Sequence, residues 1–287
     1  MKKLKRNSLP FFILLLIHTC LLGFTIQKSK NRKKIFVLLF ANMGFAYLFE
    51  YFIFNLFKAY SYKPKIVTKR IFDNIFGAFL SQAIYVPFTA VFLTRKKCGW
   101  GSKIASGIYF YLVEKVFLNL GIFKLSGWKS IYTLILLPFY FKLSDFWFAS
   151  LNKKTSIVRF LSLFFMIMVT ETNLFLILAF LRRLRMGRGR YHSWREHFIL
   201  SPLYTILISL FTAIILRKRN VFGVKLGVVL FAAFLNKLFV KLKILKNTLH
   251  PIAYYAIRSI MIFVYGQYRE WVYEDEMIDS LEKKNNQ

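Results

Sequence analysis

Apolar runs close to twenty residues long recur along the chain, and short connectors rich in Lys and Arg separate them. A helix of about twenty residues crosses the roughly 30 Å hydrocarbon layer of a bilayer, and a soluble domain does not repeat apolar runs of this length. The pattern therefore predicts an all-α fold, a polytopic transmembrane helix bundle of eight or nine spans. The expected spans cover residues 9–26, 35–57, 75–94, 104–123, 131–148, 157–181, 198–216, 221–240 and 252–268.

Two of these runs leave the number of spans open. Pro138, Lys142 and Asp145 interrupt the fifth run, and the ninth is about 17 residues long and contains Arg258. Such a segment either crosses the bilayer, enters it as a re-entrant loop or lies in the interface. With nine spans the C-terminus lies on the opposite side of the membrane from the N-terminus, and with eight it lies on the same side.

The connectors indicate the domain organisation and the orientation. We expect one transmembrane domain over residues 1–268, with a subdivision near residues 182–197, and an acidic polar tail over residues 269–287; no internal repeat is evident. Connectors on the side of the N-terminus carry 20 Lys and Arg residues, against 14 on the other side. Because cytoplasmic loops are richer in Lys and Arg, this predicts a cytoplasmic N-terminus.

The composition narrows the class of partner. A net charge of +31 would suggest nucleic acid in a soluble protein, but here the bases lie in short clusters between apolar runs. Anionic membrane lipids are the simpler partner, and we expect no nucleic-acid binding. The two cysteines provide neither a disulfide framework nor a metal-binding spacing, and no cofactor motif occurs. No A-x-A-like cleavage site follows the first run, which predicts an uncleaved first span.

Carboxylates within the apolar runs are the most informative residues. Glu114 lies near the centre of the fourth run, and Gly107, Glu114 and Gly121 recur at seven-residue spacing. On a helix these residues share one face, where glycine lets a neighbouring backbone approach closely. A carboxylate at this depth costs a few kcal/mol unless it has a partner or a wet cavity. Glu114 is therefore either a proton or cation site or a hydrogen-bonded residue that joins helices.

Two further glutamates pose the same question. Glu171 stands beside Thr170, Thr172 and Asn173 in a span otherwise rich in Phe, Leu, Ile and Met, so these side chains need partners in protein or water. Glu50 lies about one turn beyond the centre of the second span, where Tyr47 and Tyr51 are the expected donors. We take Glu114, Glu171, Glu50 and Asn173 as the candidates for ion coupling or for buried polar contacts.

Cations within the runs are candidate partners for these acids. We predict Lys115 and Arg258 as counter-ions, since both lie inside expected spans. Asp145 and Lys142 are three residues apart, which predicts an interfacial pair on one helix face. If the three glutamates meet in one cavity, the protein is a proton- or cation-coupled carrier.

A histidine-containing connector invites a metal interpretation, but its spacing disfavours one. His192, Glu196 and His197 match neither H-E-x-x-H nor its inverse, and six arginines surround them. We therefore predict no metal ligands and no catalytic residues. The connector is better interpreted as a basic loop on lipid headgroups. The candidate contacts are Arg182, Arg183, Arg185, Arg188 and Arg190.

Two stretches in the first half carry a family resemblance. They are FEYFIFNLFKAYSYKPK at residues 49–65 and DNIFGAFLSQ at residues 73–82. They resemble uncharacterised multi-pass membrane proteins of spore-forming Gram-positive bacteria, and the similarity continues through Glu114 and Leu120-Gly121-Ile122. The resemblance implies a bacterial cell membrane and transfers no catalytic role.

Three functions remain open on the sequence. The first is a non-enzymatic integral membrane protein with a structural or assembly role at an anionic bilayer, through a membrane-protein partner or self-association. The second is a proton- or cation-coupled transporter that uses intramembrane glutamates. The third is a lipid enzyme with His192 or His197 as its base.

Overall fold

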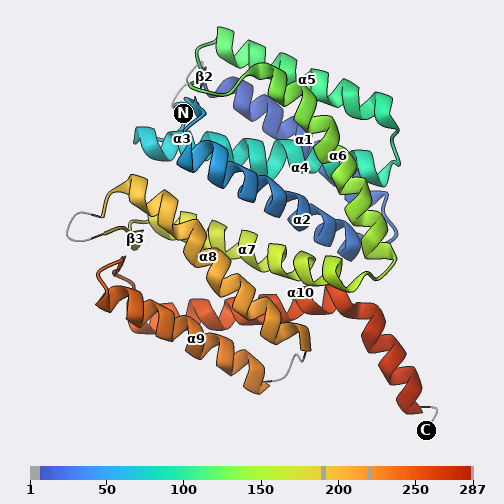
Figure 1. The fold of residues 1–287 in the computed structure, drawn as a ribbon, viewed down its shortest axis with the longest axis vertical. Helices are drawn as coiled ribbons and strands as arrows, with labels where there is room; N and C mark the ends of the chain where they lie inside the picture. The colour runs from blue at the N-terminus through green and yellow to red at the C-terminus, as the bar shows by residue number, and fades with distance from the viewer. Residues whose placement is uncertain (1–6, 189–191, 219–221, 286–287) are drawn as a thin grey trace. The chain divides into compact units, whose positions relative to one another are not determined.

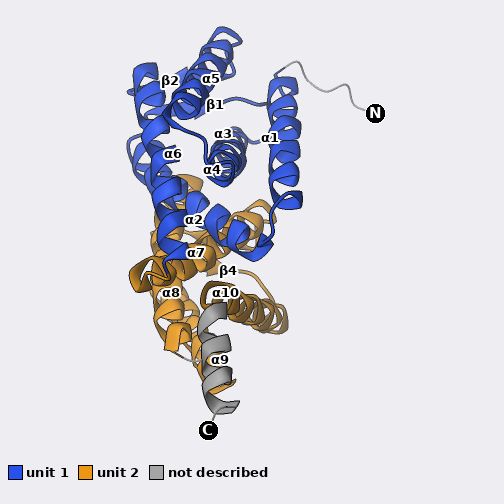
Figure 2. Ribbon diagram, turned by 90° about the vertical axis from the view of Figure 1, so that its right-hand side faces the viewer, with its two compact units in different colours: residues 1–153 blue, residues 154–287 orange. Residues whose placement is uncertain are grey.

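The apolar runs form helices, and the basic connectors form the turns between them. The computed structural model describes residues 7–188, 192–218 and 222–285, with side chains as far as residue 273. Over these residues the chain is largely helical, and its strands are three residues long. It divides into two compact units, residues 1–153 and 154–287 (Figure 2).

Unit 1 consists of long helices joined at one place by a short β-bridge. Strands β1 and β2 pair antiparallel, with Tyr60 opposite Leu125, and α5 packs along α6 (Figure 1). The elements are α1 (Leu9–Gln27), α2 (Arg32–Glu50), the π-helix η1 (Tyr51–Leu56), β1 (Tyr60–Tyr62), α3 (Arg70–Phe79), the π-helix η2 (Leu80–Tyr85), α4 (Val86–Arg95), α5 (Trp100–Asn119), β2 (Phe123–Leu125) and α6 (Ser130–Asn152).

Unit 2 has a second β-bridge of the same kind. Strands β3 and β4 pair antiparallel, with Leu184 opposite Asn247, and α7 packs against α8 and α10. Tyr273 has non-helical dihedral angles inside α10. The elements are α7 (Ser156–Phe180), β3 (Leu184–Met186), α8 (Trp194–Lys218), α9 (Phe222–Lys241), β4 (Leu245–Asn247) and α10 (Pro251–Asn285).

The predicted all-α polytopic bundle is confirmed. Within the described part of the chain, seven helical segments are long and apolar enough to cross a bilayer. They include α2 with η1, and the continuous helix of α3, η2 and α4. The expected fourth and ninth spans correspond to α5 and α10, which carry more polar and charged residues. The protein is therefore a helical, multi-pass membrane protein.

The two units repeat one order of elements, which the sequence does not reveal. Leaving α1 aside, each unit runs helix, strand, helix, helix, strand, helix. The hydrogen bonds around the two bridges also correspond. Lys63 N donates to Ile122 O at 2.8 Å in unit 1, and Gly187 N donates to Ile244 O at 2.9 Å in unit 2. The repeat therefore lies in the order of elements and in the backbone hydrogen bonds, and not in the pattern of residue types.

The turns before the strands show the same correspondence. The helix that precedes each strand ends near a residue with positive φ, at Lys58 and Gly121 in unit 1 and at Arg182 and Lys243 in unit 2. This left-handed conformation ends the helix and turns the chain into the strand. The backbone geometry repeats although the residue types do not, so side-chain patterns alone conceal the duplication.

The boundary between the two compact units lies elsewhere than the subdivision suggested by the connectors. The division falls at residues 153 and 154, in the short turn between α6 and α7, and not near residues 182–197. That connector contains β3, whose backbone bonds to β4 hold α8 and α9 in the same unit as α7. The polar composition of residues 182–197 therefore indicates a loop within unit 2.

Candidate functional site

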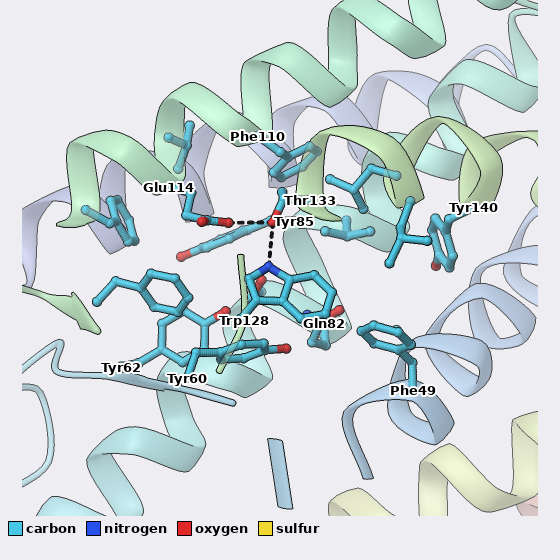
Figure 3. Close-up of a pocket in the computed structure, with 18 of the residues that line it drawn as sticks. Phe49, Tyr60, Tyr62, Gln82, Tyr85, Phe110, Glu114, Trp128, Thr133 and Tyr140 are labelled. Carbon is cyan, nitrogen blue, oxygen red and sulfur yellow. Dashed lines mark hydrogen bonds between the residues drawn. The ribbon is translucent and has the colours of Figure 1, made fainter. Parts of the chain in front are cut away.

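A cavity in unit 1 combines apolar walls with one buried carboxylate. Its volume is about 440 Å³, and apolar surface makes up most of its lining. The walls come from α1, α2, η2, α4, α5, α6 and the two strands (Figure 3). Pockets of roughly 300–1,000 Å³ accommodate small organic ligands. The polar groups of the lining are Tyr60, Tyr62, Ser81, Gln82, Tyr85, Glu114, Trp128, Thr133 and Tyr140.

Glu114 is held at the cavity wall by a short hydrogen-bonded chain. Trp128 Nε1 donates to Thr133 Oγ1 at 2.9 Å, and Thr133 Oγ1 donates to Glu114 Oε2 at 2.5 Å (Figure 3). The Glu114 side chain is buried, with 9% of its surface exposed. Its second oxygen, Oε1, has no hydrogen-bond partner among the described residues. The carboxylate is therefore oriented through one oxygen and has acceptor capacity on the other.

The glycines on the Glu114 face have two different roles. A Cβ atom at Gly107 would lie 2.9 Å from Pro138 Cγ, so glycine is needed for the close approach of α5 and α6. Gly121 instead has φ +65° and open space around its Cα, and it ends the helix. The expected close packing therefore applies to Gly107. It places the Glu114 face of α5 against α6, from which Thr133 reaches the carboxylate.

Glu50 lies behind the cavity wall and orients two of the lining side chains. Its Oε1 accepts hydrogen bonds from the Tyr60 hydroxyl and from Gln82 Nε2, the latter at 2.7 Å. Tyr60 donates to Glu50 because the chain reverses at the β-bridge and returns this residue to the end of α2. Burial and the Glu50 charge raise the pKa of the Tyr60 hydroxyl, so it remains a donor at neutral pH.

Glu50 and Gln82, which are hydrogen-bonded to each other, both lie at breaks in α-helical geometry. The π-helix η1 begins directly after Glu50, and Gln82 lies within the π-helix η2. A π-helical turn contains an extra residue, which changes the direction of the side chains on it, and such turns occur often at functional sites. Two π-helices beside one cavity are an independent indication that this region is specialised.

Glu171 forms a self-contained ion pair within unit 2. Arg258 Nη1 lies 2.5 Å from Glu171 Oε1, and the Tyr265 hydroxyl donates to the same oxygen at 2.6 Å. The carboxylate is 1% exposed and the guanidinium is also buried. The two opposite charges come from α7 and α10 and neutralise each other, so the pair fixes these helices together, while Glu171 Oε2 has no hydrogen-bond partner among the described residues.

The polar residues next to Glu171 also bond to neighbouring helices. Thr170 Oγ1 lies 3.0 Å from the Tyr268 hydroxyl, and Thr172 Oγ1 lies 3.1 Å from Thr205 Oγ1. Asn173 is half-buried on the same helix. The polar stretch of α7 thus faces protein on several sides, in keeping with a role in joining helices.

The contacts of Lys115 and of Asp145 differ from those predicted from the sequence. The Lys115 ammonium lies 5.1 Å from the centre of the Tyr111 ring on its own helix. The predicted pair of Lys142 with Asp145 is wrong: Asp145 Oδ2 lies 2.8 Å from Lys103 Nζ. Asp145 also accepts a hydrogen bond from Thr94 at 2.9 Å. Because α5 packs closely on α6, the cation from the neighbouring helix reaches the carboxylate.

His197 has a structural partner in the first strand of unit 2. Its Nδ1 accepts a hydrogen bond from Met186 N at 3.0 Å. In unit 1 the corresponding strand amide, Tyr62 N, donates to Asn74 Oδ1 at 2.6 Å. His197 lies near the start of α8 and Asn74 near the start of α3, and each residue links its helix to the preceding strand. His197 is fully buried, and His192 and Glu196 lie in the loop and at the helix start before it.

The arginines of the connector 182–197 have different surroundings. Arg182, Arg183 and Arg188 are exposed. The Arg185 guanidinium instead lies 4.4 Å from the centre of the Trp194 ring, a cation–π contact. Arg190 lies outside the described residues.

Reasoning from sequence missed the residues that complete these contacts. Tyr60, Gln82, Thr133 and Tyr265 each donate to a buried glutamate, but single hydroxyl and amide side chains in apolar runs carry no distinctive pattern. Lys103 was placed in a connector. Its position one turn into α5, at the start of the helix that carries Glu114, is the available signal.

Comparison with models of protein families, with curated proteins and with solved structures finds no match. The function must therefore be argued from the residues of the site.

Proposed function

We propose that this protein is a non-enzymatic integral membrane protein whose first unit binds an amphiphilic molecule that carries an amine. The observation that carries the proposal is the cavity of about 440 Å³ with Glu114 in its wall. One carboxylate oxygen is held by Thr133, and the other has no partner among the described residues. A ligand ammonium would supply the missing donor and a compensating charge.

The walls of the cavity support the same class of ligand. Tyr60, Tyr62, Phe123 and Trp128 form an aromatic cluster, with the Tyr60 and Trp128 rings 5.8 Å apart and the Tyr62 and Phe123 rings 4.8 Å apart. Faces of Trp and Tyr attract cations, and the effect is larger away from water. An ammonium near Glu114 therefore gains from both the carboxylate and the rings, while an alkyl or aromatic chain contacts the remaining lining.

The other two glutamates support a structural role. Glu50 positions Tyr60 and Gln82, and Glu171 is neutralised by Arg258. Two of the three mid-span carboxylates thus organise helices, which agrees with a non-enzymatic protein. The exposed basic connectors fit an anionic bilayer, as the sequence suggests.

The test compares two ligands that differ in the head group. Purified protein in a neutral detergent is titrated with dodecylamine or dodecanol, and the thermal unfolding midpoint is measured. We expect the amine to raise the midpoint more, and Glu114→Gln to abolish this preference. Lys115→Gln, one position along α5 and outside the cavity lining, is the matched control and should retain the preference. Equal stabilisation by both ligands in the native protein contradicts the proposal.

A proton- or cation-coupled carrier is the second candidate function. The observation that favours it is the same acceptor oxygen of Glu114, which offers one site for a proton or small cation. Liposomes that contain the protein and a pH-sensitive dye test it. Proton flux that Glu114→Gln abolishes and Lys115→Gln preserves supports the carrier; no flux under an imposed gradient eliminates it.

A further inference from the structure

A second cavity in unit 1 has the opposite chemistry. It has a volume of about 670 Å³ and lies where the α1–α2 and α4–α5 connectors meet the last turns of α6. Its lining is rich in bases and contains one carboxylate, Asp145. The lining bases are Lys30, Lys34, Arg95, Lys97, Lys103 and Lys142. These residues are here called the basic pocket.

The one acid of the basic pocket is already neutralised within it. Lys103 is 2% exposed and forms an ion pair with Asp145 at 2.8 Å, and its ammonium also donates to the Cys98 carbonyl. Asp145 accepts a further hydrogen bond from Thr94. Lys30, Arg95, Lys97 and Lys142 therefore give the pocket a positive charge.

The surroundings of the bases hold them around the pocket. Arg95 Nη2 donates to the Lys28 carbonyl at 3.2 Å, across the two connectors. The Lys142 ammonium lies 5.9 Å from the centre of the Trp100 ring, which also lines the pocket. The chain enters α5 at Gly99, which provides no side-chain cap for the first amide groups of the helix. Gly99 and Trp100 line the pocket, so the positive end of the α5 dipole lies at it.

From this arrangement we infer that the basic pocket binds an anion that carries a phosphate group. Phosphate presents several acceptor oxygens and up to two charges, which match converging Lys and Arg donors with a helix start. Membrane lipid headgroups and free phosphate compounds share this chemistry. The inference is independent of the amine site, because the two cavities are lined by different residues and have opposite charge preference.

The variant for the test removes charge without touching the buried ion pair. Lys30, Lys97 and Lys142 are exposed residues of the pocket lining, so the triple variant Lys30→Gln/Lys97→Gln/Lys142→Gln leaves Lys103 and Asp145 in place. Exposed substitutions of this kind have small effects on stability. The control variant Lys124→Gln/Lys129→Gln removes two exposed lysines of the same unit that lie outside the pocket.

The measurement uses Trp100 as a local probe. The full-length chain, with its other four Trp residues replaced by Phe, is titrated in a neutral detergent. The titrants are inorganic phosphate, phosphatidic acid and phosphatidylcholine. We expect saturable changes in Trp100 fluorescence with a phosphate-bearing anion, weakened roughly tenfold or more in the triple variant and less than twofold in the control.

Each outcome decides between the sources of the ligand or against the inference. Saturation by inorganic phosphate supports a soluble phosphate compound, and saturation by phosphatidic acid alone supports a lipid headgroup. Equal response to phosphatidylcholine, equal weakening in the two variants, or no saturable response to either anion overturns the inference. The thermal unfolding midpoint of each variant is measured alongside, so that a loss of binding is separated from a loss of folding.

Discussion

The ion pair between Glu171 and Arg258 gives the sharpest prediction about stability. The substitution Arg258→Met removes the guanidinium and leaves the Glu171 carboxylate, 1% exposed, with the Tyr265 hydroxyl as its remaining donor. Removing one partner of a buried pair costs about 3–5 kcal/mol, because the other charge remains buried without compensation. We therefore expect the free energy of unfolding to fall by about that amount.

A double-mutant cycle tests the physical reason for this loss. Glu171→Gln alone strands the guanidinium and should also destabilise, whereas Glu171→Gln/Arg258→Met removes both charges and should recover much of the loss. The expected coupling energy is about 3 kcal/mol, at the upper end for interacting neighbours. Denaturation by SDS in mixed micelles measures the free energy of unfolding.

The control for the cycle is Tyr255→Phe, at an exposed position on the same helix, which should change the free energy of unfolding by less than about 0.5 kcal/mol. A loss below about 1 kcal/mol for Arg258→Met would refute the reasoning. Additive single and double losses would refute it as well.

Three further predictions concern the packing of unit 1, each measured as folded yield or free energy of unfolding in detergent. Gly107→Leu should lower the folded yield, because a Cβ there would lie 2.9 Å from Pro138, whereas Gly101→Leu, with open space, should not. Lys103→Met should destabilise by about 3 kcal/mol by leaving Asp145 unpaired, and Lys142→Met should have little effect; equal losses would contradict the assigned pairing. Asp73→Ala should cost about 2 kcal/mol, because its carboxylate accepts from the backbone amides of residues 65, 66 and 67; a loss of less than about 0.5 kcal/mol would count against a stabilising role of these three hydrogen bonds.

The sequence predicted the helices well because their cause is local. Apolar runs of spanning length must form helices in a bilayer, whatever their neighbours are. The β-bridges, the π-helices and the duplication depend instead on which segments meet. Positions such as Lys58 and Arg182 share a left-handed conformation without sharing a residue type, so the repeat is absent from the sequence pattern.

The candidate site was predictable only in part, for the same reason. Glu114 and Glu171 stand out because a carboxylate in an apolar run is costly. Their partners, Thr133 and Tyr265, are common residues that become significant through contact across helices. Spacing within α6 predicts Lys142 as the partner of Asp145. The ion pair is instead formed by Lys103, which lies on the neighbouring helix α5.

The measurement that tests the central proposal most directly is the location of the bound amine. A protein that retains Trp128 alone, with the other four Trp residues replaced by Phe, places one fluorophore in the cavity wall, linked through Thr133 to Glu114. We predict saturable quenching of Trp128 by a brominated long-chain amine, weaker quenching by the brominated alcohol of equal length, and loss of the difference in Glu114→Gln. Equal, non-saturable quenching by both compounds would mean that the cavity does not select an amine, and would contradict the proposed function.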